Sequence, residues 1–233
     1  MLGKIIGIRV VKTPGSDDRA MIAGVVENTT QGTTNIQFEN KKGMVYLVID
    51  CSGSMAGNKM CQAKIGILEF AQEAIKKEYL VGLIKFDNSA ARLCEPTYDI
   101  ADLRASLEGM DANGSTNMAA AITMAREHLG VTGYARAMVI ATDGRPDRTQ
   151  TALQAGQSAK NDGIDIIAIG TDDADLAFLK KLSTNSILGN KVSNEQFGKA
   201  IATAYLQLPE PEKTVQAKQF SREPQRRLQY ARY

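Results

Sequence analysis

The stretch Met44-Val45-Tyr46-Leu47-Val48-Ile49-Asp50-Cys51-Ser52-Gly53-Ser54 joins an apolar run to a short polar segment. A continuous apolar run without alternation is typical of a strand whose two faces are both buried in a parallel sheet. The polar segment places one carboxylate, Asp50, and two hydroxyls, Ser52 and Ser54, at the C-terminal end of that strand. Such oxygen donors suit Mg²⁺ better than Zn²⁺ or copper. The stretch therefore predicts a buried strand and a site for a hard metal ion at its end.

The sequence around this stretch alternates between apolar runs and amphipathic helical patterns. The strand-like runs occupy residues 44–49, 80–86, 137–141 and 164–169, with a weaker run at 187–192. The helical patterns occupy residues 59–77, 117–129, 149–162, 174–182 and 194–206. This alternation predicts a doubly wound α/β domain, with a mostly parallel sheet and helices on both of its faces. A short run at 90–94 follows the turn signal Asp87-Asn88-Ser89, which favours an antiparallel edge strand.

Two further polar segments lie where this alternation predicts loops. They are Gly114-Ser115-Thr116-Asn117 and Ala141-Thr142-Asp143-Gly144. In an open α/β sheet, ligands bind beyond the C-terminal ends of the strands, where neighbouring crossovers diverge to opposite faces. If the strands that end near Asp50 and Asp143 are neighbours, the three loops converge. Each segment taken alone is also an ordinary turn or helix start, but their order and spacing favour one shared metal site.

These three segments resemble the metal-ion-dependent adhesion site of the von Willebrand factor A (vWA) family, and the resemblance covers residues 43–208. The family pattern is D-x-S-x-S, then a threonine in a middle loop, then an aspartate after the fourth strand. It implies a six-stranded sheet with five parallel strands and one short antiparallel edge strand. It also implies that Ser52, Ser54 and Thr116 bind Mg²⁺ directly, whereas Asp50 and Asp143 act mainly through bound waters and orient the hydroxyls. Mn²⁺ or Ca²⁺ would suit the same ligands.

The function that this resemblance implies is metal-dependent protein binding by an adaptor or assembly factor, without catalysis. A metal ion with few direct anionic ligands stays electrophilic, and a Glu or Asp carboxylate of a partner protein would complete its coordination. With every side chain of the site pattern present and no signal-peptide pattern, the chain resembles an intracellular prokaryotic member of the family with an intact metal-ion-dependent adhesion site (MIDAS). Such members often act beside AAA+ ATPases, Hsp70-like chaperones, or kinase and phosphatase systems, which is an association by family alone. An alternative is self-assembly through the same metal bridge, with Asp172-Asp173-Ala174-Asp175 of a second copy as the acidic donor.

A Mg²⁺-dependent phosphohydrolase is the enzymatic alternative. A nucleophilic aspartate at a strand end usually has a second carboxylate two residues later, but Ser52 holds that position here. The sequence contains neither a P-loop motif nor a G-x-S-x-G nucleophile elbow. His128, the only histidine, falls late in a helical pattern, so we expect it at a helix end or on the surface. The sequence therefore favours a protein that is not an enzyme.

Residues 1–42 and 209–233 flank the predicted domain. Apolar runs at 4–11, 20–26 and 35–38, separated by turn residues, predict a short N-terminal β-hairpin-like extension. The segment after residue 208 is basic and contains Pro209, Pro211 and Pro224, which predicts a flexible tail without a long regular element.

Composition excludes several classes of function. The net charge is only +2 and tryptophan is absent, which argues against nucleic-acid binding. No apolar run approaches the roughly 18–20 residues of a membrane-spanning helix, and the N-terminal residues do not form a signal-peptide pattern. The three cysteines, Cys51, Cys61 and Cys94, have no metal-type spacing. We therefore expect a cytoplasmic protein without membrane insertion.

Overall fold

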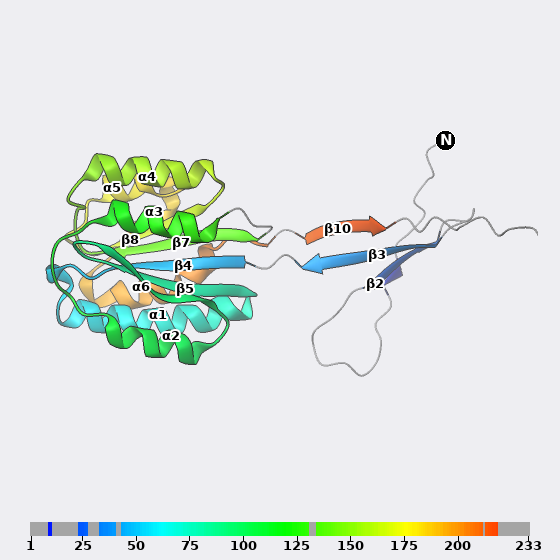
Figure 1. The fold of residues 1–233 in the computed structure, drawn as a ribbon, viewed down its shortest axis with the longest axis horizontal. Coiled ribbons are helices and arrows are strands. Elements are labelled where there is room, and N and C mark those ends of the chain that lie inside the picture. Colours follow the sequence, from blue (N-terminus) through cyan, green and yellow to red (C-terminus); the bar gives the residue numbers. More distant parts are fainter. Residues whose placement is uncertain are drawn as a thin grey trace, which may run out of the picture. The chain divides into compact units, whose positions relative to one another are not determined.

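A six-stranded sheet with the strand order β6-β5-β4-β7-β8-β9 lies at the centre of the main unit, Lys41–Pro211 (Figure 1). The computed structural model describes residues 9–10, 23–27, 33–40, 43–130, 134–211 and 213–218. Neighbouring strands are parallel except for β6, which pairs antiparallel with β5. The fold is thus the predicted doubly wound α/β domain. The strands are β4 (Gly43–Asp50), β5 (Tyr79–Phe86), β6 (Ala90–Thr97), β7 (Ala135–Thr142), β8 (Asp165–Gly170) and β9 (Gly189–Lys191).

Helices cover both faces of this sheet (Figure 1). One face packs against α1 (Asn58–Lys76), α2 (Ile100–Ser106) and α6 (Phe197–Thr203). The other face packs against α3 (Met118–Leu129), α4 (Thr149–Asn161) and α5 (Leu176–Leu182). Short 3₁₀ turns join several of these elements. They are η1 (Gly53–Met55), η2 (Leu107–Gly109), η3 (Ser186–Leu188), η4 (Asn194–Gln196) and η5 (Ala204–Gln207).

The central strand β4 contributes to two hydrophobic cores at once. Val45, Leu47 and Ile49 point into the layer of α1, α2 and α6, while Tyr46 and Val48 point into the layer of α3, α4 and α5. All five side chains are fully buried. Successive side chains of a strand point to opposite faces, so a strand covered on both sides must be apolar throughout. This burial explains the uninterrupted apolar run and fixes the position of the polar segment that follows it.

Several elements of the main unit differ from the sequence prediction. Helix α2 is not among the predicted helices, although Asp99 caps it by accepting a hydrogen bond from the Ala101 backbone N–H at 2.7 Å. The predicted helix at 194–206 is divided into η4, α6 and η5. The weak run at 187–192 forms the strand β9 over only three residues, after η3. These short elements, of three to seven residues, give too few periods for the pattern to be recognised.

A second unit consists of Met1–Asn40 together with Glu212–Tyr233. Its described strands form an antiparallel sheet with the order β1-β2-β3-β10. They are β1 (Arg9–Val10), β2 (Ala23–Glu27), β3 (Thr33–Asn40) and β10 (Lys213–Lys218). The strand β10 is not predicted by the sequence analysis, which treats the whole segment 209–233 as a flexible tail. The prolines do not prevent it, because Pro211 precedes this strand and Pro224 follows it. The predicted turn residues between the runs at 4–11 and 20–26, and the tail beyond residue 218, lie outside the described residues.

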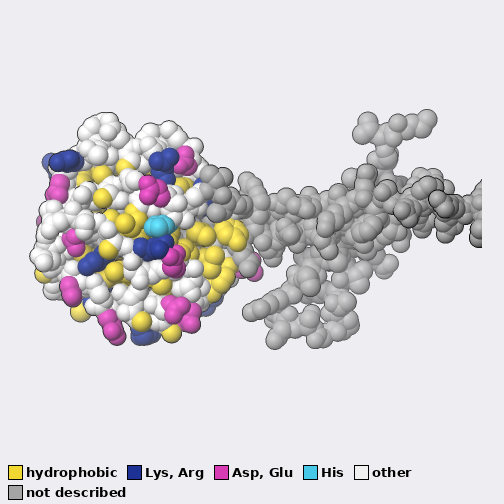
Figure 2. Space-filling view, in the orientation of Figure 1, with side chains coloured by type: hydrophobic (Ala, Val, Ile, Leu, Met, Phe, Trp, Pro, Cys, Tyr) yellow, Lys and Arg dark blue, Asp and Glu magenta, His cyan; other side chains and the backbone are white. Residues whose placement is uncertain are grey.

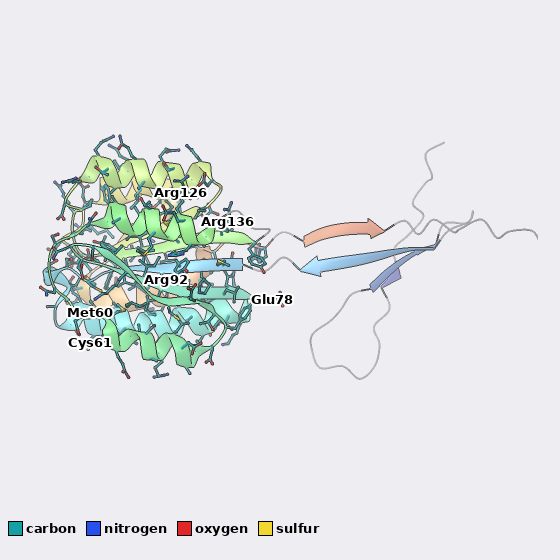
Figure 3. All side chains as sticks on the ribbon, in the orientation of Figure 1. Met60, Cys61, Glu78, Arg92, Arg126 and Arg136 are labelled. Carbon is teal, nitrogen blue, oxygen red and sulfur yellow. The ribbon has the colours of Figure 1, made fainter. Side chains whose placement is uncertain are left out.

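Both ends of the main unit lie at the N-terminal end of β4. Gly43 begins that strand, and Tyr79, at the start of the neighbouring β5, donates its hydroxyl hydrogen to the carbonyl oxygen of Pro209. Glu78 lies at the same end, whereas Met60 and Cys61 of α1 lie at the end that carries the polar loop (Figure 3). The described residues include no helix that is long and apolar enough to cross a membrane.

A close contact between the α1 and α6 backbones predicts that Gly66→Ala destabilises the domain. A Cβ atom at Gly66 would lie 2.3 Å from the carbonyl oxygen of Gly198 on α6. Because the obstacle is backbone, the two helices must separate, and we expect a loss of about 1–3 kcal/mol in the free energy of unfolding. Denaturant unfolding measures this change. Gly109→Ala is the matched control, since its Cβ would meet nothing closer than 3.9 Å. Equal unfolding midpoints for the two variants would contradict the prediction.

Candidate metal centre

The polar loop after β4 lies at the point where the chain crossovers diverge. β4 pairs with β5 on one side and with β7 on the other, and α1 and α3 pack on opposite faces of the sheet. Asp50 is the last residue of β4, and Thr142 and Asp143 stand at the end of β7. The strands that the sequence analysis required to be neighbours are therefore neighbours. This geometry creates the crevice in which open α/β sheets bind ligands.

Asp50 is fully buried at the base of this crevice. Its Oδ1 accepts a hydrogen bond from the Ser52 backbone N–H at 2.8 Å, and its Oδ2 accepts one from the Thr142 hydroxyl at 2.5 Å. Burial raises the pKa of Asp50 to about 6, although the hydrogen bonds from Thr142 and Ser52 oppose the shift. Hydrogen bonds thus hold both carboxylate oxygens in place, and the ionised form of Asp50 is destabilised by burial unless a positive charge lies nearby.

The two serines form a chain of polar contacts that ends on Asp143. The Ser52 and Ser54 hydroxyl oxygens lie 3.2 Å apart, and Ser54 donates its proton to Asp143 Oδ1 at 2.8 Å. Asp143 is nearly fully buried, and its other oxygen accepts a hydrogen bond from Lys59 Nζ at 2.7 Å. Because the Ser54 proton is directed to a carboxylate, Ser54 can only accept in its contact with Ser52, and one further lone pair of its oxygen remains available to a cation.

Backbone hydrogen bonds attach the loop that carries Thr116 to both other loops. The Gly53 N–H donates to the Gly114 carbonyl oxygen at 3.1 Å. The Thr116 N–H donates to both oxygens of Asp147 at 3.2 Å, and the Asp147 N–H donates back to the Thr116 carbonyl oxygen at 3.1 Å. Gly114 adopts φ +76°, a left-handed conformation that glycine adopts without strain. The structure therefore brings together the three segments from which all five predicted site residues come.

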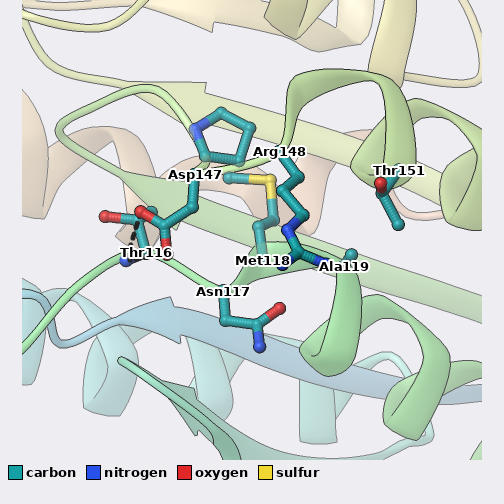
Figure 4. Close-up of a pocket in the computed structure, with 8 residues that line it drawn as sticks. Thr116, Asn117, Met118, Ala119, Asp147, Arg148 and Thr151 are labelled. Carbon is teal, nitrogen blue, oxygen red and sulfur yellow. Dashed lines mark hydrogen bonds between the residues drawn. The ribbon is translucent and has the colours of Figure 1, made fainter.

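A pocket of about 220 Å³ opens beside Thr116, between the start of α3 and the start of α4 (Figure 4). Figure 4 shows Thr116 and Asp147 on one side of it and Arg148 and Thr151 on the other. Thr116 belongs both to the pocket and to the predicted metal site. A molecule bound at the metal site through this loop would thus have space to extend toward α4.

The donor set in the crevice fits a hard divalent cation. Hydroxyl oxygens of Ser52 and Ser54 stand between two buried carboxylates, Asp50 and Asp143, and hydroxyl and carboxylate oxygens are what Mg²⁺ prefers. In the part of the chain that the structure describes, no three His, Cys, Asp or Glu side chains gather as a metal-binding cluster. These residues could therefore hold an ion mainly through neutral oxygens, with Thr116 as a further hydroxyl in the adjoining loop.

Three residues of the site were missed by the sequence analysis. Thr142 holds Asp50, Asp147 holds Thr116, and Lys59 pairs with Asp143. Lys59 carries a recognisable signal, because a cation in the first turn of a helix opposes the helix dipole and needs a nearby carboxylate. Thr142 and Asp147 carry no comparable signal, since threonine is common in strands and Asp147 lies in an ordinary loop sequence.

The described cysteine and histidine side chains are not among the oxygen donors of the candidate metal site. Cys51 lies within the loop, but it is fully buried, and burial raises the pKa of its thiol to about 12, so it stays a protonated thiol. His128 is exposed in the last turn of α3, as expected, with its Nδ1 3.0 Å from Arg92. Cys61 is exposed on α1.

Comparison with known proteins identifies the family. The sequence pattern of the von Willebrand factor type A domain matches residues 45–205. The chain belongs to this family. Its vWA domain is similar in fold to that of the type V pili tip protein Mfa5 from Porphyromonas gingivalis. The TM-score is 0.65 at 15% identity, over 72% of this chain and 95% of that chain. A von Willebrand factor type A protein from Catenulispora acidiphila gives a TM-score of 0.61 at 17% identity, over 74% of this chain and 44% of that chain.

Two further matches of the vWA domain are described with a metal ion. Proximal thread matrix protein 1 of the mussel byssus, in a structure with a zinc-occupied MIDAS motif, gives a TM-score of 0.62 at 13% identity. That match covers 80% of this chain and 50% of that chain. The magnesium-chelatase 67 kDa subunit of Chlorobaculum parvum is 31% identical over 115 residues. This stretch is 47% of this chain but only 19% of that subunit, so the chain corresponds to less than a fifth of that relative.

Proposed function

We propose that this vWA domain binds a divalent metal ion and uses it to bind an acidic side chain of a partner protein. Ser52, Ser54 and Thr116 would be direct ligands. Asp50 and Asp143 would accept hydrogen bonds from metal-bound waters and orient the hydroxyls. The observation that carries the proposal is the hydrogen bond from Ser54 to Asp143 at 2.8 Å, which directs the serine proton to the carboxylate and leaves a lone pair of the hydroxyl oxygen for a cation.

The chemistry of such a centre explains why a partner would bind it. The bound ion would supply a strong positive charge with an open coordination position. Neutral hydroxyl ligands do not neutralise that charge, so a Glu or Asp carboxylate from another protein is the natural ligand for the open position. The pocket beside Thr116 gives the partner's neighbouring residues a place to pack (Figure 4). The domain would therefore act as a metal-dependent protein-interaction module.

Mg²⁺ is the ion that we propose, with Mn²⁺ or Ca²⁺ as alternatives of similar ligand preference. Oxygen ligands alone do not distinguish these three ions. Similarity to a magnesium-chelatase subunit supports only a general link to a multi-subunit enzyme. We propose an adaptor or assembly role in the cytoplasm. AAA+ ATPases are the first partner class to test, followed by chaperones and kinase or phosphatase systems. The free thiols of Cys51, Cys61 and Cys94 are consistent with a reducing compartment.

Self-assembly through the same metal bridge is less favoured, because carboxylates of its proposed acidic donor segment, residues 172–175, already have partners in their own chain. Asp175 caps α5 by accepting hydrogen bonds from the Ala177 and Phe178 N–H groups, and it pairs with Arg145 at 3.1 Å. Asp173 pairs with Lys59 at 3.1 Å. A second copy would have to break the helix cap and the ion pair of Asp175 to use that carboxylate, whereas the exposed Asp173 pair would cost little to break.

Catalysis is the less favoured alternative for this centre. The position two residues after Asp50 is Ser52, whose oxygen faces Ser54 and supplies no acid or base. A non-enzymatic binding role accounts for the polar groups present without requiring a further catalytic group.

The surface charge does not favour nucleic-acid binding either. The face seen in Figure 2 shows interspersed basic and acidic side chains, with no broad basic patch for nucleic acid.

An affinity pull-down from native cell extract tests the proposed function. The full chain would be used as bait with Mg²⁺, with EDTA, and as the Asp50→Asn variant with Mg²⁺. A partner captured only by the unaltered chain in Mg²⁺ is the expected result, and its purified form should bind with the same metal dependence. Retention of the same partner under all three conditions would place the interaction away from the metal loops and contradict the proposal.

A further inference from the structure

Lys59 places a fixed positive charge inside the candidate metal centre. Its Nζ lies 2.7 Å from Asp143 Oδ2, and only 17% of the Lys59 side chain is exposed. It also reaches Asp173 at 3.1 Å, but that carboxylate is 66% exposed and its charge is screened by water. The hydrogen bond to the buried Asp143 carboxylate holds the Lys59 ammonium group in place. The ammonium group is therefore a constant part of the site.

Lys59 changes the net charge around the two serines. Asp50 and Asp143 supply two negative charges, and Lys59 removes one of them. Asp147 and Arg148 both line the pocket beside Thr116 and add one charge of each sign there. A divalent ion held there would then carry one unneutralised positive charge, which a single carboxylate of a partner would match. Without Lys59 the two aspartates alone would neutralise the ion.

We propose that Lys59 is a built-in counter-charge that weakens metal binding and reserves the charge of the loaded centre for a partner carboxylate. This inference rests on the proposed function. It makes metal binding and carboxylate binding cooperative, because each is favoured by the presence of the other. Lys59 acts through Asp143 as a positioning residue, and we assign it no direct contact with the ion.

Titration with Mn²⁺ at low ionic strength tests this proposal, with free Mn²⁺ measured by electron paramagnetic resonance. The proteins compared would be the unaltered chain, Lys59→Met, Lys59→Gln and the control Lys64→Met, at the next lysine along α1. Each would be titrated in sodium acetate and in sodium chloride of equal ionic strength, with free Mn²⁺ calibrated in each buffer. Acetate serves as the carboxylate probe, and circular dichroism checks that each variant is folded.

We expect both Lys59 variants to bind Mn²⁺ about tenfold more tightly than the unaltered chain, because one repulsive charge has been removed. We also expect acetate to tighten Mn²⁺ binding in the unaltered chain and in Lys64→Met, and to do so less in the Lys59 variants. Unchanged affinities in both variants would overturn the inference. A change confined to Lys59→Met would also overturn it, since glutamine retains the hydrogen bond to Asp143 without the charge. Absence of Mn²⁺ binding in every protein would instead refute the proposed function.

Discussion

Asp50→Asn is expected to stabilise the metal-free protein at neutral pH and to abolish its stabilisation by Mg²⁺. Burial raises the pKa of Asp50 from 3.8 to about 6, so the folded state holds the Asp50 proton more tightly than the unfolded state does. The stability from this group is fully present below about pH 4 and is lost as pH rises through about 6. A shift of roughly two pKa units corresponds to about 3 kcal/mol. Asparagine removes this cost, while its amide can still hydrogen-bond to Ser52 and Thr142.

Thermal unfolding of both proteins from pH 4 to pH 8, with and without Mg²⁺, measures this effect. Without metal, the difference in stability between Asp50→Asn and the unaltered chain should grow as pH rises from about 4 to 6 and then remain constant. With Mg²⁺ only the unaltered chain should gain stability, because a ligand stabilises the state that binds it. Asp111→Asn, at an exposed aspartate near the same loops, is the matched control. A variant that is less stable at pH 7.5 without metal, or that still responds to Mg²⁺, would refute this assignment.

Thr116→Ala is expected to abolish metal-dependent partner binding while leaving the fold intact. Thr116 is half-buried, and the contacts that fix its loop are made by backbone atoms that alanine retains. The loss of stability should therefore stay below about 1 kcal/mol, as for substitutions outside the core. The proposed metal ligand is lost, so we expect at least a hundredfold weaker binding of the partner captured in Mg²⁺. Binding to purified partner, measured by calorimetry, gives this number.

Thr116→Ser is the control for this substitution, because serine keeps the hydroxyl oxygen and removes only a methyl group. It should bind the partner within a few-fold of the unaltered chain. If alanine and serine at this position bind equally well, the Thr116 hydroxyl is not a ligand. The metal site would then consist of the β4 loop and Asp143 alone.

Much of the fold can be predicted from the sequence because the central strands are buried on both faces. The apolar run that ends at Ile49 admits few alternatives, and Asp50 marks its end in both the sequence and the structure. Helix α2 and strand β9 escape prediction because each is too short to show a period. Strand β10 escapes it because its partner β3 lies about 175 residues earlier in the sequence, and local patterns carry no information on such pairing.

Some residues of the candidate site can likewise be predicted from the sequence, and others cannot. Ser52 and Ser54 are recognisable because their spacing and their place after an apolar strand are both local features. The contacts from Lys59, Thr142 and Asp147 depend on which loops meet, which the sequence alone does not give. The charge of Lys59 at a helix start is a local signal of its carboxylate partner, but it does not identify that partner as Asp143. The sequence thus predicts the oxygen donors, and the structure adds the groups that hold and balance them.

Isothermal titration calorimetry with Mg²⁺, repeated with Mn²⁺, tests the central claim most directly. The proteins compared would be the unaltered chain and the double variant Ser52→Ala/Ser54→Ala, both checked for folding by circular dichroism. Our account predicts one bound ion per unaltered chain and no binding by the double variant. Equal binding by both proteins, or no binding by the folded unaltered chain, would show that these serines do not form a metal centre.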